Sequence, residues 1–561
     1  MNLSKISQRE LKWRLRCFGI VVFSILVCLT GCIGGKVGKG SIPGDIEKSK
    51  LRNIEGLDLK KMSKIPAESL EEVRESIREE EGKSNKESAA VPPLKDTRKG
   101  PVFLTLEQAR EYALANNLGL RSSLITPAIA SQKVNLEQSR FDATFSSSIS
   151  HEDNLMDRPG GYYKSLSSLT VPLPTGGSVS VGKQIESKQL GTWFKTVHTQ
   201  GDGVDIKQPL LKGAGIRVAT APILIARLES HMSQAQTKIN MIQLLAEVEI
   251  VYWQLEAAQR ELIIHENQLK LAQTQLENAE KLIAARLFTK AERIRANAGL
   301  LARKEALIVA KTSVRLRERE LKRLMQLPDL PVDSTNPIIC KTDWMPLRIK
   351  LDPKEVVTKA MENRMDLATL QLQLLMNDIN IKLANNSLFP YLNLEMSYRR
   401  LGQALTQSQA TKNLYGQNRS VDDYTVGATL AYPLGNRQSK AFRETSRLEK
   451  LKTLSSKEDL KIRIRKEVLD AVDQVERDWN RIVAAMDAAE GAMEAYEAEV
   501  EQNFAGRRTS TEVLEASQNL AEAESRVVRA LADYATSKVY IALSTGTMLG
   551  FSNIVWEPVE Q

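Results

Sequence analysis

The fold is decided by residues 241–283, which read MIQLLAEVEIVYWQLEAAQRELIIHENQLKLAQTQLENAEKLI. Large apolar residues recur at every seventh position from Met241 to Ile283, and smaller ones follow three positions after most of them. This heptad pattern is typical of a coiled-coil helix, and it predicts a helix from Arg217 to Ala285, about 100 Å long at 1.5 Å per residue. The pattern resumes between Thr289 and Leu327, which predicts an antiparallel partner and hence a long helical hairpin.

The same hairpin recurs near the C-terminus. Apolar residues repeat at seven-residue spacing along residues 468–500 and again along residues 513–541. The turn segments of the two hairpins align without a gap at an offset of 220, so that 285–292 corresponds to 505–512. Duplication is the simplest explanation. Because neither hairpin has a compact core of its own, each must pack beside other helices.

A second pair of corresponding segments precedes the hairpins, now at an offset of 247. Leu104–Ala109 and Leu351–Val356 each open a helix that we expect to run for about 38 residues. Alternating apolar and polar residues then appear at residues 145–150, 203–211, 392–398 and 425–434. Alternation is the period of a strand with two different faces, so each half predicts a helix, a pair of strands and a long hairpin.

Only the first half contains a further candidate strand pair. Residues 165–171 and 178–185 also alternate, and they flank the turn sequence Pro172–Gly177. The sequence leaves open whether these strands join the same sheet as the others or only decorate it. In the first case each chain contributes six strands, and in the second it contributes four.

The N-terminus has the pattern of a secretory signal. A basic stretch precedes an apolar run from Cys17 to Leu29, which at 13 residues is too short for a comfortable membrane span. The run ends in Leu29-Thr30-Gly31-Cys32, which resembles the lipobox of bacterial lipoproteins, where the cysteine is lipidated and becomes the first residue after cleavage. We therefore expect a signal peptide over residues 1–31 and a covalent lipid on Cys32. Ile33 instead of Asp after the cysteine favours sorting to the outer membrane; a plain signal or short anchor is the alternative.

Composition and charge argue against several classes of function. Residues 1–31 contain five basic residues and one acid, so their removal lowers the formal net charge from +9 to +5 and leaves little support for nucleic-acid binding. Three of the four cysteines lie before residue 33, which leaves Cys340 alone, and the four histidines are scattered singly. We therefore expect no disulfide framework, no metal site, no catalytic residues and no cofactor besides the lipid.

The order and duplication of these motifs resemble the TolC-like outer membrane efflux protein family. The resemblance covers about residues 104–550 and rests on the Leu-x-Leu-Glu-x-Ala opening at Leu104, the Gln-Pro-Leu strand end at 208–210, and the segment 506–516 running on to Ser544-Thr545-Gly546. It implies a mainly α fold with a transmembrane β-barrel portion, built from a duplicated helix, strand pair and coiled-coil hairpin as a trimeric channel. The chain accordingly divides into a signal peptide (1–31), a flexible charged tether (32–100), a first repeat (101–330), an equatorial connector (331–350), a second repeat (351–550) and a tail (551–561).

The function that the resemblance implies is transport without chemistry. The chain would be the outer membrane exit duct of a tripartite efflux pump or type I secretion system, conducting substrates passively across periplasm and outer membrane. Its partners would be two further copies of itself, a periplasmic adaptor (membrane fusion) protein, an inner-membrane transporter and outer membrane lipids, with no nucleic acid. Strand count points the same way, because open sheet edges are costly in lipid and two strand pairs are too few to enclose a pore. The substrate and the energy source of the pump stay open.

The resemblance also places a gate at the hairpin tips. Glu512 and Glu515 fall at the positions of the family's ring of acids. Arg508 falls on the linking arginine, and Glu292 falls on the acidic partner of that arginine in the other hairpin. The family has Asp where this chain has Glu, so the reach of the side chains differs. The alternative is that these acids only complement the helix dipole, as acids in any first helical turn do.

Four tip residues are candidate contacts for the adaptor: Leu287 and Phe288 on the first tip, and Gly506 and Arg507 on the second. Two apolar side chains exposed at a tip would suit contact with a helical hairpin of that partner. Packing between neighbouring hairpins is the alternative. Arg286 stands where the family usually has glycine, which puts the docking geometry of the first tip in question.

Two other functions compete with the channel as explanations of the sequence. A periplasmic lipoprotein adaptor has one hairpin flanked by small β domains, whereas this sequence has two hairpins. A lipid-anchored coiled-coil scaffold without a pore gives the strand segments at 143–211 and 391–434 no reason to alternate or recur. Both alternatives therefore explain less of the sequence than the channel does.

Overall fold

The computed structural model describes residues 100–153, 161–190, 195–284, 289–342, 346–416, 419–504 and 507–552. All of them lie in the unit formed by residues 56–561, and the fold described below is that of this unit. The signal peptide, Cys32 and almost the whole of the tether lie outside the described residues.

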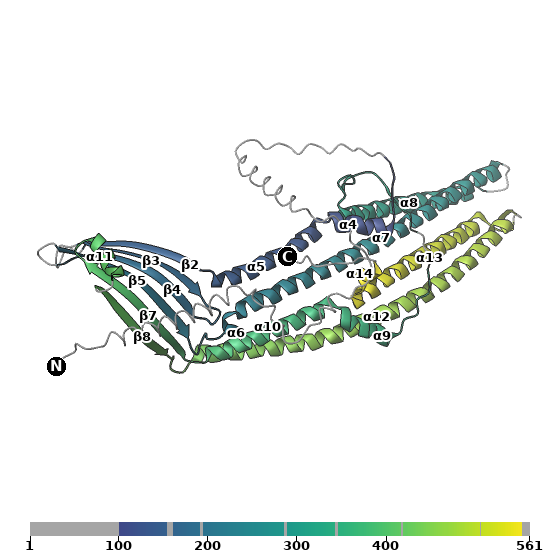
Figure 1. The fold of residues 1–561 in the computed structure, drawn as a ribbon. Helices are drawn as coiled ribbons and strands as arrows, with labels where there is room; N and C mark the ends of the chain where they lie inside the picture. The colour runs from purple at the N-terminus through teal and green to yellow at the C-terminus, as the bar shows by residue number, and fades with distance from the viewer. Residues whose placement is uncertain are drawn as a thin grey trace, which may run out of the picture. The chain divides into compact units, whose positions relative to one another are not determined.

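One antiparallel sheet of six strands contains the strands of both halves, in the order β2-β3-β4-β5-β7-β8 (Figure 1). Its strands are β2 (Thr144–Asp153), β3 (Gly161–Pro172), β4 (Ser178–Leu190), β5 (Lys195–Pro209), β7 (Tyr391–Ala404) and β8 (Ser420–Ala431). The candidate strand pair of the first half is therefore β3–β4 and belongs to the sheet. Strand β3 pairs with β2 and β4, and β4 pairs with β3 and β5.

The two long helical hairpins are present as predicted. They are formed by α7 (Ala221–Ala284) with α8 (Lys290–Met325), and by α12 (Arg437–Phe504) with α13 (Ser510–Thr545). Thr289 and Thr509 are the N-caps of the two returning helices and have nearly the same backbone conformation, with φ, ψ of −87°, 158° and −86°, 157°. The offset of 220 therefore holds in the structure as well as in the sequence.

The prediction of one long helix in front of each strand segment was wrong. Each is divided in two: α4 (Leu106–Asn116) with α5 (Leu118–Gln138), and α9 (Pro353–Asn363) with α10 (Met365–Ser387). The division falls at Asn117 and Arg364, which are related by the offset of 247 and have extended ψ angles of 114° and 118°. Both side chains donate to a distant carbonyl, Asn117 to Leu324 (3.0 Å) and Arg364 to Ser544 (3.2 Å). These two carbonyls are related by the other offset, 220, so each repeat fixes its bend in the same way.

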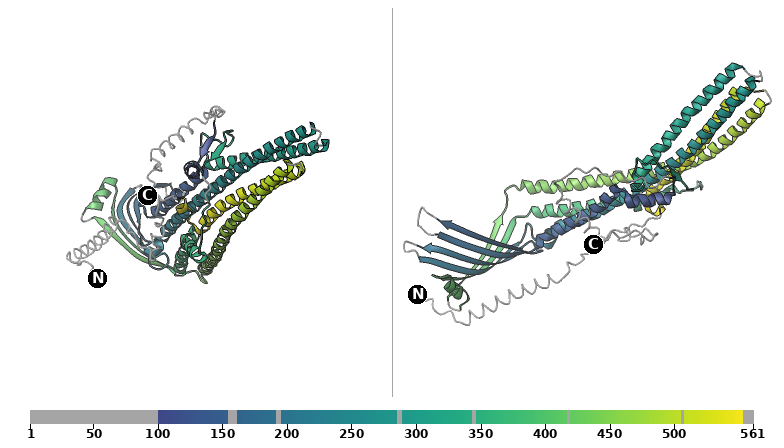
Figure 2. Two further views of the ribbon diagram at one scale, coloured as in Figure 1. Left: turned by 90° about the vertical axis from the view of Figure 1, so that its right-hand side faces the viewer. Right: turned by 90° about the horizontal axis from the view of Figure 1, so that it is seen from above.

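Helices α5, α7, α10 and α12 lie side by side next to the sheet, and the hairpins α7–α8 and α12–α13 extend beyond them to their tips (Figure 2). Near the sheet, α7 packs against α5 and α10, and α10 packs against α12. Toward the tips, α7 packs against α8 and α13, and α13 packs against α12. None of the described helices is long and apolar enough to cross a membrane.

The core lies where the front helices meet the hairpins, and it is duplicated too. Ala113 and Ala360, related by 247, and Val248 and Val468, related by 220, are all fully buried. A parallel pair of short strands, β1 (Val102–Leu104) and β6 (Ile338–Cys340), adds to the first core. The sequence did not predict this pair. Four short helical segments complete the fold: η2 (Ser139–Phe141), α6 (Ile216–Ala219), α11 (Gln407–Tyr415) and α14 (Met548–Phe551).

Candidate channel wall and hairpin tips

The six-stranded sheet has one apolar face near the helices. Residues that pair across neighbouring strands point to the same face, so each register position forms a row. One row crosses all six strands and consists of Phe145, Leu169, Val181, Val204, Tyr398 and Tyr424. The next row of the same face, one step closer to the helices, consists of Val171, Val179, Ile206, Met396 and Val426. We call this the apolar face.

The opposite face, which we call the polar face, carries hydroxyl and charged groups at the same level. One of its rows consists of Thr144, Thr170, Ser180, Asp205, Ser397 and Thr425. Neighbouring hydroxyls bond to each other across strands, with 2.9 Å between Thr170 Oγ1 and Ser180 Oγ. A wall with one apolar and one polar face suits a boundary between lipid and water.

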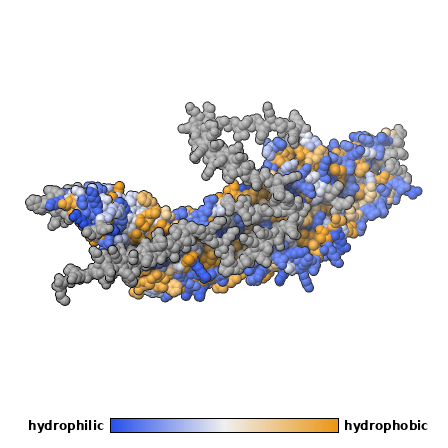
Figure 3. Space-filling model, in the orientation of Figure 1, coloured by the Kyte–Doolittle hydropathy of each residue, from blue (hydrophilic) through white to orange (hydrophobic). Residues whose placement is uncertain are grey.

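On the apolar face, the apolar rows are followed by one row without a single apolar side chain, which we call the polar row. One register step farther from the helices than Phe145, this row consists of Ser147, Ser167, Lys183, Asp202, Arg400 and Asp422. Tyr398 and Tyr424 lie just inside it with their ring centroids 5.1 Å apart, and the hydroxyl of Tyr398 donates to Asp422 (3.2 Å). Figure 3 shows hydrophobic residues of the sheet toward the helices and hydrophilic ones toward its far end. Aromatic residues at the border of an apolar band are typical of a membrane interface.

Beyond the polar row, the apolar face is covered by helix α11. Ala410 and Leu414 of this helix are fully buried against the sheet. Its polar side chains reach the sheet as well: Thr411 donates to Gln200 (3.0 Å) and Tyr415 to Asp202 (3.0 Å). Gly402 makes the contact possible, because a Cβ atom there would lie 2.3 Å from the amide nitrogen of Leu414.

Among the described residues, neither margin of the molecule has a neighbour beyond it. Strands β2 and β8 each pair on one side only. Helix α5, which leads into β2, exposes an apolar stripe at helical spacing, as do α8 and α12, the outermost helices of the two hairpins. The exposed side chains are Leu118, Ile125, Ile129 and Leu136 on α5, Ile294, Leu301, Ile308 and Leu316 on α8, and Leu448, Leu451, Ile462, Met486 and Met493 on α12. Apolar stripes of this extent mark surfaces that contact another protein.

At the second hairpin tip, Glu512 is held by three groups. Its carboxylate accepts from the Thr509 amide (2.7 Å) and the Thr509 hydroxyl (3.1 Å), and from Arg508 Nη1 (2.8 Å). Arg508 also donates to Gln502 (3.1 Å) and lies 3.5 Å from the Glu499 carboxylate. The hydrogen bond from the Thr509 amide, and next that from Arg508, lowers the pKa of Glu512 below its ordinary value. The hydrogen bond to Glu512 and the charge of Glu499 raise the pKa of Arg508.

At the first tip the corresponding acid has a different partner. Glu292 lies at the same helical position as Glu512, but it pairs with Arg295 on its own helix (2.8 Å). Within one chain, Arg508 and Glu292 thus each bind inside their own hairpin. Glu515 is exposed and lies about one helical turn after Glu512 on α13. The gate assignment of these four residues stays a prediction.

Of the candidate docking residues, only Arg507 is described; Leu287, Phe288 and Gly506 lie outside the described residues. Arg507 is exposed, and its amide donates to the Gln502 carbonyl (2.9 Å), which closes the end of α12. The adaptor contact stays a prediction for all four.

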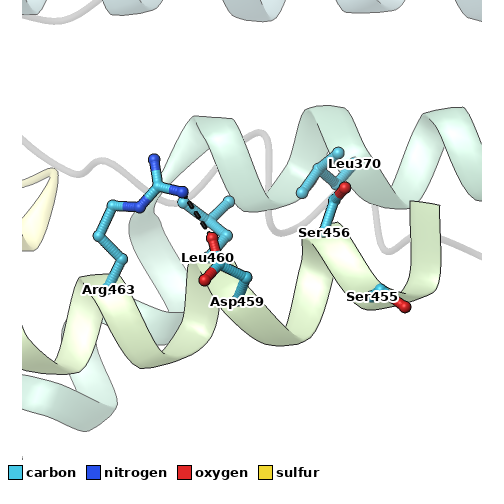
Figure 4. Close-up of a pocket in the computed structure, with 6 residues that line it drawn as sticks. All are labelled: Leu370, Ser455, Ser456, Asp459, Leu460 and Arg463. Carbon is cyan, nitrogen blue, oxygen red and sulfur yellow. Dashed lines mark hydrogen bonds and ion pairs between the residues drawn. The ribbon is translucent and has the colours of Figure 1, made fainter. Parts of the chain in front are cut away.

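Two other features bear on possible ligand sites. Among the described residues, no three His, Cys, Asp or Glu side chains are placed to hold a metal ion. A shallow, open groove between α10 and α12 is lined by Leu370, Ser455, Ser456, Asp459, Leu460 and Arg463 (Figure 4). Its two charged groups already pair with each other at 2.6 Å. Such a groove offers a ligand little enclosure and few free polar groups.

Comparison with known proteins gives a consistent picture. Residues 356–547 match the family model described as outer membrane efflux protein. No curated protein matches the sequence. The fold is similar to the outer-membrane channel OprN (TM-score 0.57, 18% identity, 82% of this chain and 97% of that chain). It is also similar to the CmeC outer membrane channel of Campylobacter jejuni (0.60, 14%, 81% and 87%) and to the outer membrane protein VceC of Vibrio cholerae (0.59, 14%, 79% and 96%).

Proposed function

We propose that the chain is a member of the outer membrane efflux protein family, whose model matches residues 356–547, and that it forms the outer membrane exit duct of a tripartite efflux pump or type I secretion system. Substrates would pass through it without chemical change. The family consists of channels, and its fold is the fold described above.

The observation that carries this proposal is the pair of unpartnered margins. One margin is formed by β2, α5 and α8, and the other by β8 and α12. Each margin combines a free strand edge with an apolar helical stripe. Since the two margins differ, the contact between copies is head-to-tail, and a head-to-tail contact closes into a ring when the rotation fits. A closed ring pairs every strand edge, which lipid requires.

Three copies would form this ring, as in the family, and the ring would enclose one continuous pore. In the sheet, the apolar face would contact lipid and the polar face would line the pore. The long hairpins would form a helical tunnel in the periplasm. A periplasmic adaptor protein and an inner-membrane transporter would complete the pump and supply its energy.

A lipid on Cys32 would anchor the chain to the outer membrane. The support is the sequence Leu29-Thr30-Gly31-Cys32 after a short apolar run. Besides this lipid, we propose no cofactor.

The tips would form the gate. Glu512 and Glu515 are three residues apart on α13, so in a ring of three copies they would place two rings of carboxylates at the aperture. Arg508 would hold the closed state through Glu512 and Glu499 of its own hairpin and, across hairpins, through Glu292. Leu287, Phe288, Gly506 and Arg507 would contact the adaptor.

Single-channel conductance of the purified protein in a planar bilayer tests the proposal. We expect discrete channels from the wild type, with larger or longer openings for the double variant Glu512→Ala/Glu515→Ala. Absence of channels in both proteins would refute the exit duct. Channels that the double substitution leaves unchanged would refute only the gate.

A further inference from the structure

The two repeats contribute unequal numbers of strands to the sheet. The first repeat gives β2, β3, β4 and β5 to the sheet, whereas the second gives β7 and β8. Strands β3 and β4 are as long as the others and pair along almost their whole length, from Tyr162 with Lys188 to Pro172 with Ser178. Among the described strands, they are also the only link between β2 and β5, so they form part of the wall of the sheet.

The turn between β3 and β4 is fixed to the chain that leads out of the sheet. The hydroxyl of Thr175 donates to Gln208 (2.7 Å), and the amide of Gly215 donates to the Thr175 carbonyl (3.0 Å). Gly176 has a φ of +88°, and a Cβ atom there would lie 2.4 Å from the carbonyl oxygen of Gly213. The turn is therefore packed into the junction between sheet and helices and does not extend freely from it.

Strands β3 and β4 also have the same two faces as the rest of the wall. Leu169 and Val181 belong to the apolar face, while Ser168 and Thr170 belong to the polar face. Ser146 and Ser168 are bonded at 2.9 Å across the β2–β3 pair, which continues the hydroxyl row of the polar face. A strand pair that only decorated the wall would have no reason to continue both patterns.

We propose that three copies of this chain form a barrel of eighteen strands, wider than the twelve-stranded barrel that four strands per chain would give. The proposal deepens the proposed function and rests on it. With strands about 4.8 Å apart and tilted by about 40°, eighteen strands enclose a circle on the order of 35 Å across, against roughly 24 Å for twelve. Inward side chains take about 5 Å on each side. The outer membrane section is therefore a wide, water-filled vestibule lined by hydroxyl groups, which admits bulky hydrophilic solutes.

Neutral polymers of graded size measure this width. Poly(ethylene glycol) added on the side of the strand tips reduces channel conductance only if it enters the barrel. We expect polymers with a hydrodynamic radius of about 10 Å to enter the wild-type barrel. Deletion of residues 161–190 joins β2 to β5 as antiparallel neighbours, and we expect this variant to exclude the same polymers. The control variant Ser168→Ala/Ser180→Ala keeps both strands and should behave as the wild type. Equal size limits for the wild type and the deletion variant would overturn the proposal.

A labelling experiment on the full-length chain decides the question even if the deletion variant fails to fold. Single cysteines are placed at Ser168 and Ser180 on the polar face, and at Leu169 and Val181 on the apolar face, in protein reconstituted in lipid vesicles. We expect a membrane-impermeant maleimide to label the first pair at least tenfold faster than the second. The partly buried Cys340, whose pKa burial raises to about 12, should stay unlabelled. Equal labelling of both faces would show that β3 and β4 lie outside the wall. This readout needs no conductance, so it separates failure of the wide barrel from failure of the exit duct.

Discussion

The two repeats differ little in their helices and greatly in their strands. Helical residues correspond one to one, as Ala113 does to Ala360 and Thr289 to Thr509. The sheet instead receives four strands from the first repeat and two from the second. The second repeat also adds helix α11, which lies on the apolar face. A helix with neighbours on both sides has little freedom to change its contacts. A sheet grows by adding hydrogen-bonded neighbours, so its strand number is free to differ between repeats.

The largest effect is expected in the core of the first repeat. Tyr252 is fully buried, and its hydroxyl donates to the Leu104 carbonyl at 3.0 Å. We expect Tyr252→Ala to lower the free energy of unfolding by about 3–5 kcal/mol, and Val472→Ala, at the matching position of the second repeat, by about 2 kcal/mol. Tyr252→Phe should cost only about 1–2 kcal/mol. Urea unfolding followed by helical circular dichroism measures all three. Equal losses for Tyr252→Ala and Val472→Ala would mean that the two cores are energetically alike.

The bend of each repeat is the next test. Arg364 also pairs with Asp366 (2.6 Å) and Glu467 (2.8 Å), whereas Asn117 accepts only the Leu120 amide and donates to Leu324. We expect Arg364→Ala to cost about 2–3 kcal/mol and Asn117→Ala about 1–2 kcal/mol. Arg364→Lys should recover only part of the loss. The lysine keeps the positive charge, but its ammonium group reaches fewer of these acceptors at once. The same urea titration gives the values, and a larger loss for Asn117→Ala would reverse the order.

Among the described helices, α11 has no counterpart in the first repeat, and its attachment is expected to cost less to break. Gly402→Ala places a methyl group against the backbone of Leu414, so we expect α11 to detach more often. A loss of about 1–2 kcal/mol would raise the detached fraction 5- to 30-fold. Trypsin cleavage after the exposed Lys412, in protein reconstituted in vesicles, measures that fraction. Gly427→Ala is the control, because no atom lies within 4 Å of its Cβ position. Unchanged cleavage in Gly402→Ala would show that α11 tolerates the contact.

The smallest effect is expected at the tips, as a dependence on pH. Since folding lowers the pKa of Glu512, its contribution to stability is complete above the unfolded pKa of about 4.3 and disappears as the pH falls through the lower, folded pKa. The Thr509 amide, which donates to Glu512, should therefore exchange its hydrogen faster below about pH 4, after correction for the intrinsic rate. Glu512→Gln should remove this pH dependence. The same acid response in the variant would assign it to another group.

Repeats and alternation in the sequence predicted most of the helices and strands, but not the contacts between distant segments. The bend at Asn117 was missed because no Gly or Pro marks it, and its partner carbonyl lies 207 residues away. The polar row was missed because Lys183, Asp202 and Arg400 meet only through the register of three strands. At the tips, Glu512 was found from the resemblance, whereas its capping contact with Thr509 is a local pattern that the sequence already contains.

The unequal repeats also say how such a protein can evolve. A strand pair inserted between β2 and β5 begins and ends at the same end of the sheet. The helix that follows β5 therefore starts from the same position with or without the pair. The junction at Gly213 and Gly215 accepts the new turn with its own backbone groups. The number of strands in the sheet can therefore change by inheritance of one additional strand pair, while the helical parts remain under their own selection.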